Sequence, residues 1–101
     1  MEIFRKKRQR ALAAGELSVR PARPEDATAI VRFVHALSLS DGGLASKLTK
    51  EEFLKQGFGE DPAFRVLLAE VGDAPAGYAL FFGGYDTDRA ARGVYLSDLY
   101  V

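Results

Sequence analysis

FRVLLAEVGDAPAGYALFFGGY, residues 64–85, contains two apolar runs separated by a short turn. The runs 64–71 and 76–85 are rich in the apolar and aromatic side chains that favour strands. The turn between them, residues 72–75, contains Gly, Asp and Pro, and a connection of that length joins antiparallel neighbours. The sequence therefore predicts a β-hairpin at the centre of the fold.

Two further strands are predicted outside this hairpin. Residues 93–101, GVYLSDLYV, form another apolar run after the polar segment 86–92. Near the start of the chain, Leu17 and Val19 belong to a short strand that Pro21 should end. We expect these four strands to make a mostly antiparallel sheet in the order 1-2-3-4.

Two helices are predicted between the first and second strands. Apolar residues recur at helical spacing over 30–37, so the first helix should run from Pro24 to about Leu39. Thr49 and Glu52 form a capping-box pattern, which predicts a second helix over 50–56. Gly57 is expected to be the left-handed residue that ends it. The element order is then β-α-α-β-β-β, an α+β fold with the helices packed on the sheet.

The composition excludes several classes of protein. The chain has 101 residues, which allows one small domain. It has no cysteine and one histidine, so a disulfide framework, a thiol nucleophile, a zinc ribbon and a histidine-rich metal site are excluded. An apolar run of about 18 residues, enough to span a membrane, is absent from the sequence. The pattern of a signal peptide is missing too, so we expect no metal, no membrane contact and a cytoplasmic location.

The net charge of zero hides an asymmetry. Residues 1–10 hold five basic side chains and one acidic one, whereas the rest of the chain has an excess of acidic residues. Residues 1–15 are therefore expected to be a basic amino-terminal arm, and 16–101 the folded domain. Such an arm could contact nucleic acid, but the basic patch Arg5–Arg10 contains no aromatic residue for base stacking. A solvated terminus is the favoured interpretation.

Ser97 and Asp98 interrupt the otherwise apolar last strand. Polar side chains in a buried strand need hydrogen-bond partners. Two explanations remain open at this point: the strand lies at a sheet edge that faces water, or it lines a cleft that requires polar groups.

Four stretches of the chain resemble the GNAT acyltransferase superfamily, and within it the diamine (spermidine/spermine) acetyltransferases and their bacterial relatives. Each stretch is weakly specific, but they occur in the family's order over residues 17–101. They are VRPA at 19–22 with the acidic pair 25–26, LTKE at 48–51 with GFGEDP at 57–62, VLLAE at 66–70 with AGYA at 76–79, and GVYLSDLYV at 93–101.

This resemblance implies that residues 16–101 are the amino-terminal part of an N-acetyltransferase domain. Such a domain transfers acetyl from acetyl-CoA to an amine, here a polyamine or another small amine. The resemblance assigns the backbone of Leu99, Tyr100 and Val101 to the acyl-pantetheine arm. It assigns Ser40, Asp41 and Ser97 to the acceptor side, where an acidic Asp41 would suit a cationic polyamine.

The chain departs from the family pattern in two respects. Ser97 stands where the diamine branch commonly has glutamate, so the proton of the amine should leave through water or through Asp98. Asp98 and Ser97 are therefore the catalytic candidates. The family's [QR]-x-x-G-x-[GA] loop, which binds the CoA pyrophosphate, is also not found in these 101 residues. A truncated GNAT domain that is inactive by itself is the resulting expectation.

Two other functions are kept as alternatives. The chain could be a non-catalytic remnant that acts as an interaction module. Its last strand would then join it to a second copy, as a homodimer, or to a complementary fragment. The other alternative is a small nucleic-acid-associated protein that uses the basic arm, and salt-dependent binding to oligonucleotides would favour it.

Overall fold

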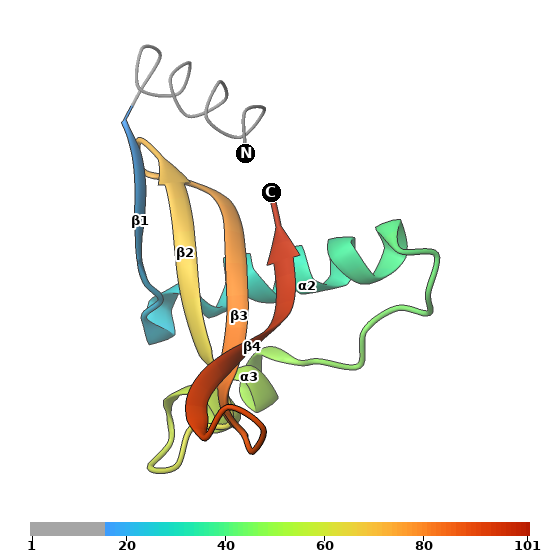
Figure 1. Cartoon of the computed structure of the whole chain (residues 1–101). Coiled ribbons are helices and arrows are strands. Elements are labelled where there is room, and N and C mark those ends of the chain that lie inside the picture. The colour runs from blue at the N-terminus through green and yellow to red at the C-terminus, as the bar shows by residue number, and fades with distance from the viewer. Residues whose placement is uncertain (1–15) are drawn as a thin grey trace.

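The computed structural model describes residues 16–101, which form one four-stranded sheet and two helices (Figure 1). The expected basic arm, residues 1–15, lies outside the described residues. In chain order the elements are β1 (Leu17–Pro21), the 3-10 turn η1 (Pro24–Asp26), α2 (Ala27–Ser40), α3 (Lys50–Phe58), β2 (Arg65–Val71), β3 (Ala74–Asp86) and β4 (Ala91–Tyr100). The predicted α+β class and element order are confirmed.

The strands are antiparallel throughout and lie in the order β1-β2-β3-β4, as predicted. The central hairpin turns more tightly than expected, because Ala74 already pairs with Val71 and so belongs to β3. Gly72 lies in this turn with a φ of 62°, a conformation that glycine adopts without a steric penalty. The short connection therefore sets the β2–β3 pairing, as the sequence indicated.

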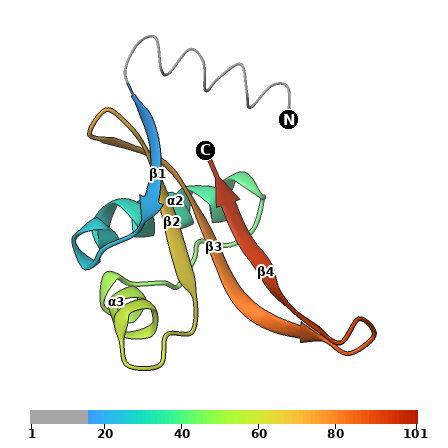
Figure 2. The same ribbon diagram turned by 60° about the vertical axis from the view of Figure 1, so that its left-hand side comes forward.

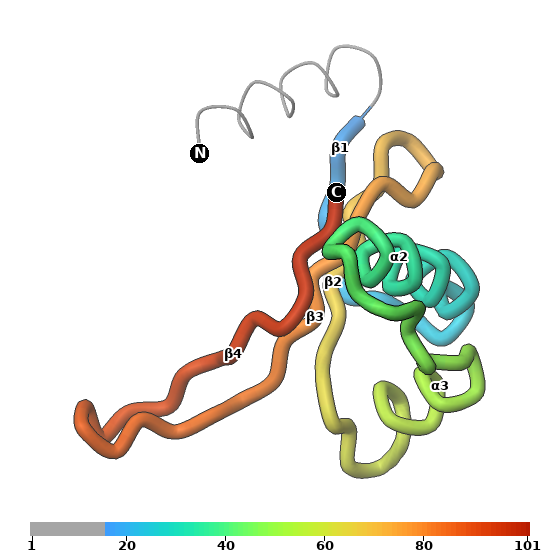
Figure 3. Tube along the Cα trace, turned by 90° about the vertical axis from the view of Figure 1, so that its right-hand side faces the viewer, coloured from blue at the N-terminus to red at the C-terminus, as the bar shows by residue number. Residues whose placement is uncertain are grey.

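Both helices lie on the same face of the sheet, with α2 crossing behind the strands and α3 below it (Figures 2 and 3). The core between these layers is made of hydrophobic residues, with the phenol of Tyr78 as its one polar group. It consists of Ala27, Ile30, Val34, Phe53, Val66, Leu68 and Tyr78. Over the opposite face of the sheet, residues 16–101 place no helix. Val19 and Leu99 on that face are exposed.

The β3–β4 hairpin projects well beyond the helices and the other two strands (Figure 3). Its turn is shorter than the predicted loop 86–92, because β3 continues to Asp86 and β4 begins at Ala91. Phe82 and Tyr95 pair across this ribbon with their ring centroids 5.1 Å apart. Both rings are nevertheless exposed, since no other described element covers them.

Helix α3 begins as predicted and ends later than predicted. The hydroxyl of Thr49 accepts a hydrogen bond of 3.1 Å from the Glu52 amide, which satisfies a free donor of the first turn. The expectation of a left-handed cap at Gly57 is wrong, because α3 continues through it to Phe58. A Cβ at Gly57 would lie 2.8 Å from the ring of Phe64. The glycine therefore makes space for packing rather than ending the helix.

Arg20 on β1 fixes the direction in which the chain enters α2. Its guanidinium donates two hydrogen bonds to the Asp26 carboxylate, at 2.8 and 2.9 Å, and a third of 2.9 Å to Glu70 on β2. Asp26 also accepts a bond from the backbone amide of Arg23. The hydrogen bonds from Arg20 lower the pKa of Asp26 below its usual value. This cluster holds the first turn of the helix against the sheet.

Candidate functional site

Ser97 is the extra residue of a β-bulge in β4. Asp98 pairs with Leu80 and Leu96 pairs with Phe81, so two steps along β4 oppose one step along β3. In a regular strand the side chains of neighbouring residues point to opposite faces, whereas a bulge re-aims them. Here the Ser97 hydroxyl donates a hydrogen bond of 3.1 Å to Oδ1 of Asp98. The bulge thus brings the two catalytic candidates together.

Asp98 has a second partner, which the sequence did not indicate. The phenol of Tyr78 on β3 donates a hydrogen bond of 2.8 Å to Oδ2 of Asp98. Tyr78 is only 2% exposed, and its ring stacks on that of Phe33 in α2 at a centroid distance of 6.3 Å. Burial, followed by the hydrogen bond to Asp98, raises the pKa of Tyr78 far above its usual value. The phenol is therefore a protonated hydrogen-bond donor at neutral pH.

The two acceptor-side candidates at the end of α2 are both exposed, but they are not equivalent. The Ser40 hydroxyl donates to the Leu37 carbonyl at 3.0 Å, so its proton is used within the helix. Asp41 is the C-cap residue, and its charge contributes to the raised pKa of Tyr78, although less than that of Asp98. Asp41 and Asp98 thus act on one phenol. Ser97 and Asp98 are hydrogen-bonded to each other, the charge of Asp41 acts on the same phenol as that of Asp98, and Ser40 has only a local hydrogen bond within the helix.

The last residues of β4 lie at the edge of the sheet. Leu99 and Tyr100 pair with Ala79 and Tyr78 of β3, and Val101 follows the strand. Within residues 16–101 no strand lies on the other side of β4, so its outward N–H and C=O groups are available to another partner. The side chains of Leu99 and Val101 are 60% and 67% exposed, whereas Tyr100 packs on Phe33.

Beside this edge is an apolar hollow of about 190 Å³ on the face that the helices do not cover. Leu67, Gly77, Leu99 and Val101 are among its lining residues. A Cβ at Gly77 would collide with the carbonyl oxygen of Tyr100 and lie 3.1 Å from the Cα of Val101. Glycine at this position therefore permits the close approach of β3 to the end of β4.

Gly77 and Tyr78 are site residues that were not predicted from the sequence. They lie in the AGYA stretch at 76–79, which contributes to the resemblance to the acyltransferases but predicted no site residue. A usable signal was present, because Tyr78 is a polar residue in an apolar run and a buried hydroxyl requires a partner. What the sequence does not contain is the register of β3 against β4, which pairs Tyr78 with Tyr100 and thereby brings its phenol to Asp98.

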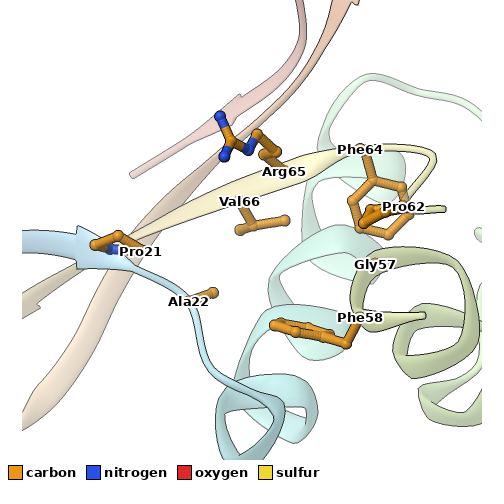
Figure 4. A pocket seen from close by; sticks show the side chains of 8 residues that line it. All are labelled: Pro21, Ala22, Gly57, Phe58, Pro62, Phe64, Arg65 and Val66. Atoms are coloured by element: carbon orange, nitrogen blue, oxygen red, sulfur yellow. The ribbon is translucent and has the colours of Figure 1, made fainter. Parts of the chain in front are cut away.

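A second hollow, of about 170 Å³, lies between the end of β1, helix α3 and the start of β2 (Figure 4). Phe58 and Phe64 form one of its sides, and Pro21 and Ala22 lie across from them. Arg65 is the one charged residue among those that line it. Since this hollow contains no acid–base pair, the Ser97–Asp98 region is the better candidate site.

Residues 16–101 contain no group of three or more His, Asp or Glu side chains arranged to hold a metal ion. Among the helices in this part of the chain, none is long and apolar enough to cross a membrane.

The chain has curated relatives that are named as acetyltransferases. It is 35% identical over 92 residues to thialysine N-epsilon-acetyltransferase of Mus musculus, a match that covers 82% of this chain and 54% of the relative. It is 33% identical over 91 residues to spermidine/spermine N(1)-acetyltransferase-like protein 1 of Homo sapiens, covering 82% of this chain and 13% of that protein. No family model matches the chain.

Solved structures share the fold at lower sequence identity. A possible acetyltransferase from Clostridium difficile 630 matches 84% of this chain and 57% of its own length, with a TM-score of 0.66 and 17% identity. Ribosomal-protein-alanine N-acetyltransferase from Brucella melitensis biovar Abortus 2308 matches 84% of this chain and 56% of its own, with a TM-score of 0.60 and 18% identity.

These comparisons confirm the resemblance to the GNAT acyltransferases: the chain is homologous to N-acetyltransferases and has the fold of part of their domain. It spans about half the length of the thialysine acetyltransferases that it matches.

Proposed function

We propose that this chain takes part in acetyl transfer from acetyl-CoA to a small amine. The observation that carries the proposal is the β4 bulge, where Ser97 and Asp98 share a hydrogen bond on a strand whose end is free at the sheet edge. The named N-acetyltransferases among the relatives support the same reaction class.

The reaction requires a neutral amine, and Asp98 is the proposed proton acceptor. Acetyl-CoA supplies a thioester when bound, so that a C–N bond forms as the C–S bond breaks and the thiolate leaves. Asp98 takes the amine proton directly or through one water molecule. The Ser97 hydroxyl donates to Asp98, and its oxygen can therefore accept an N–H of the amine at the same time. Together they would hold the nitrogen beside the end of β4.

The outer edge of Leu99–Val101 is the proposed contact for the pantetheine arm. Pantetheine contains two amides, which can pair with strand N–H and C=O groups much as another strand would. The edge position of β4 in the described sheet and the exposed side chains of Leu99 and Val101 fit such a contact. Gly77 contributes to this contact region, because the absence of a side chain lets β3 lie close to the backbone of Tyr100.

We propose that the acceptor is an amine with a second positive charge. Asp98 on β4 accepts the hydrogen bond of the Tyr78 phenol, and the charges of Asp98 and of Asp41 at the end of α2 both raise the pKa of that phenol, so two negative charges act on the same group. A diamine or a diamino acid could place one nitrogen at Asp98 and its distal ammonium near Asp41. Thialysine and spermidine, which appear in the names of two relatives, are both of this kind.

Amine binding to the isotope-labelled chain tests this proposal. Spermidine and thialysine should shift the NMR signals of Asp41, Ser97 and Asp98, and acetyl-CoA should shift those of Leu99 to Val101. Asp98→Asn should weaken amine binding about tenfold or more, because a charged hydrogen bond is lost. Asp73→Asn, in the exposed β2–β3 turn, is the matched control and should bind as the wild type does.

Acetyl transfer by the chain alone is expected to stay at background, because the pyrophosphate motif is not among its 101 residues. Amine shifts scattered over the surface, or unchanged binding by Asp98→Asn, would contradict the proposed acceptor site. Turnover above background would show instead that these residues are sufficient to hold the acyl donor.

A second candidate function is an interaction module joined through β4. The observation that favours it is a row of exposed apolar side chains along this edge strand. The row consists of Val94, Tyr95, Leu96, Leu99 and Val101. An exposed strand edge with apolar side chains is a site of association. A homodimer or a complex with a complementary fragment would bury it, with or without catalysis.

A further inference from the structure

We infer that Tyr78 is a positioning residue, which holds the Asp98 carboxylate in one orientation for the amine. The inference rests on the proposed function, since it concerns the carboxylate that we propose as proton acceptor. It depends on the contacts among Tyr78, Ser97 and Asp98 and on the packing that holds the Tyr78 ring.

Both oxygens of the Asp98 carboxylate are engaged. Tyr78 donates to Oδ2 at 2.8 Å from β3, and Ser97 donates to Oδ1 at 3.1 Å from the bulge. Without these donors, a half-buried aspartate on an edge strand would exchange between rotamers, and a ligand that fixed it in one rotamer would pay an entropy cost. Two donors on two oxygens remove this freedom before the amine arrives. Oδ1 keeps a second lone pair with which to accept from the amine.

The Tyr78 phenol is itself held rigidly. Its ring lies between α2 and the sheet, 2% exposed, stacked on Phe33 and tilted against Tyr100 at 6.3 Å. Its β3 position pairs with Tyr100, two residues beyond Asp98 on the same face of β4. The hydroxyl position is thus set by the core, whereas Asp98 is only half-buried. A rigid donor orients a more mobile acceptor.

The surrounding charges indicate that Tyr78 positions Asp98 and does not act as an acid. The groups that act on its phenol are Asp98 and Tyr100 on β4 and Asp41 at the end of α2, and all of them oppose its ionisation. If the phenol gave its proton to a leaving thiolate, the phenolate would remain in a buried position and would face the negative charge of Asp41. Its hydrogen is moreover already donated to Asp98. Orientation is therefore the role that this geometry permits.

Tyr78→Phe removes the hydroxyl and keeps the ring that packs on Phe33. The direct readout is the set of three-bond couplings that report χ1 of Asp98, which needs neither substrate nor turnover. We expect one rotamer in the wild type and averaging over rotamers in Tyr78→Phe. Tyr95→Phe is the matched control, because Tyr95 is an exposed tyrosine on β4 itself, and it should leave the couplings unchanged.

Amine binding supplies the second readout. Tyr78→Phe should weaken it about three- to tenfold, the range for one lost hydrogen bond. In the Asp98→Asn background the same change should have almost no further effect, because Tyr78 acts through the carboxylate. A thermal melt of Tyr78→Phe detects any general loss of stability. A general loss of structure would also shift NMR signals throughout the core and not at Asp98 alone.

The outcomes separate the inference from the proposed function. An Asp98 side chain that keeps one rotamer in folded Tyr78→Phe overturns the positioning role, whatever amines do. Additive losses in the double variant overturn it as well. If the wild type binds no amine while the couplings change as expected, the proposed function is wrong and Tyr78 still orients Asp98.

Discussion

Gly77 determines how closely β3 approaches the end of β4. A methyl group on Gly77 would collide with the Tyr100 carbonyl oxygen, which belongs to the backbone and cannot turn away. We expect Gly77→Ala to lower the free energy of unfolding by about 1–3 kcal/mol, as overpacking does, and to shift the NMR signals of Tyr100 and Val101. Chemical denaturation measures the loss.

Gly83→Ala is the matched control for this prediction, because it lies on the same strand and a Cβ there meets nothing within 4 Å. It should change stability by no more than about 0.5 kcal/mol. Equal effects of the two alanines would mean that the close approach at Gly77 is not a constraint on β4.

Asp26 should make stability depend on pH in the acid range. Its pKa is lowered in the folded state by the hydrogen bonds from Arg20, so the carboxylate stabilises the fold. This contribution is complete above the unfolded pKa of about 4 and disappears as the pH falls through the lower folded value. Asp26→Asn should therefore melt below the wild type at pH 7, and the difference should shrink as the pH approaches 2.

Melting curves across this pH range measure the effect, and Asp61→Asn, an exposed carboxylate, is the control. A difference between Asp26→Asn and the wild type that is constant from pH 7 to pH 2 would show that the Arg20 contact does not depend on the charge of Asp26.

Helix α3 depends on its amino-terminal cap more than α2 does. It has only nine residues, and Phe53 is its one buried side chain, so little packing holds its first turn. Thr49→Ala removes the acceptor of the Glu52 amide and should cost about 1 kcal/mol. Hydrogen exchange at Glu52 should accelerate correspondingly. Thr28→Ala, an exposed threonine in α2, should change stability by no more than about 0.5 kcal/mol.

At the scale of the whole molecule, β4 should determine the oligomeric state. Val94 on the projecting hairpin is 72% exposed and belongs to an apolar row on an unpaired edge. We expect a homodimer at micromolar concentration, detected by light scattering. Val94→Lys should dissociate it, because a lysine on the edge opposes strand pairing. Val19→Lys, on the opposite edge strand β1, should leave it intact.

A wild-type monomer with a cooperative melt would contradict this prediction. Dissociation by Val19→Lys alone would place the contact on the uncovered sheet face rather than on β4. In either case the acceptor site could still bind amines, so the proposed chemistry does not depend on the assembly.

Local patterns in the sequence were sufficient for most of the elements. A hairpin is predicted from the apolar run over 64–71, the turn after it and the run that follows. The residues of both runs favour strands, and the connection is too short to join parallel strands. The Thr49 cap is local as well, since acceptor and donor are three residues apart. The resemblance of four such stretches was likewise enough to identify the family of relatives.

Only the tertiary structure decided how the site is assembled. The Tyr78–Asp98 hydrogen bond joins residues 20 positions apart, and it exists because β3 and β4 pair in one register and are bulged at Ser97. A shift of one residue would turn Tyr78 to the opposite face. The predicted role of Gly57 was wrong for the same reason. The Phe64 ring, which follows α3 in the chain, packs where a Cβ of residue 57 would lie. Contacts between distant segments depend on register and packing, which local sequence patterns do not specify.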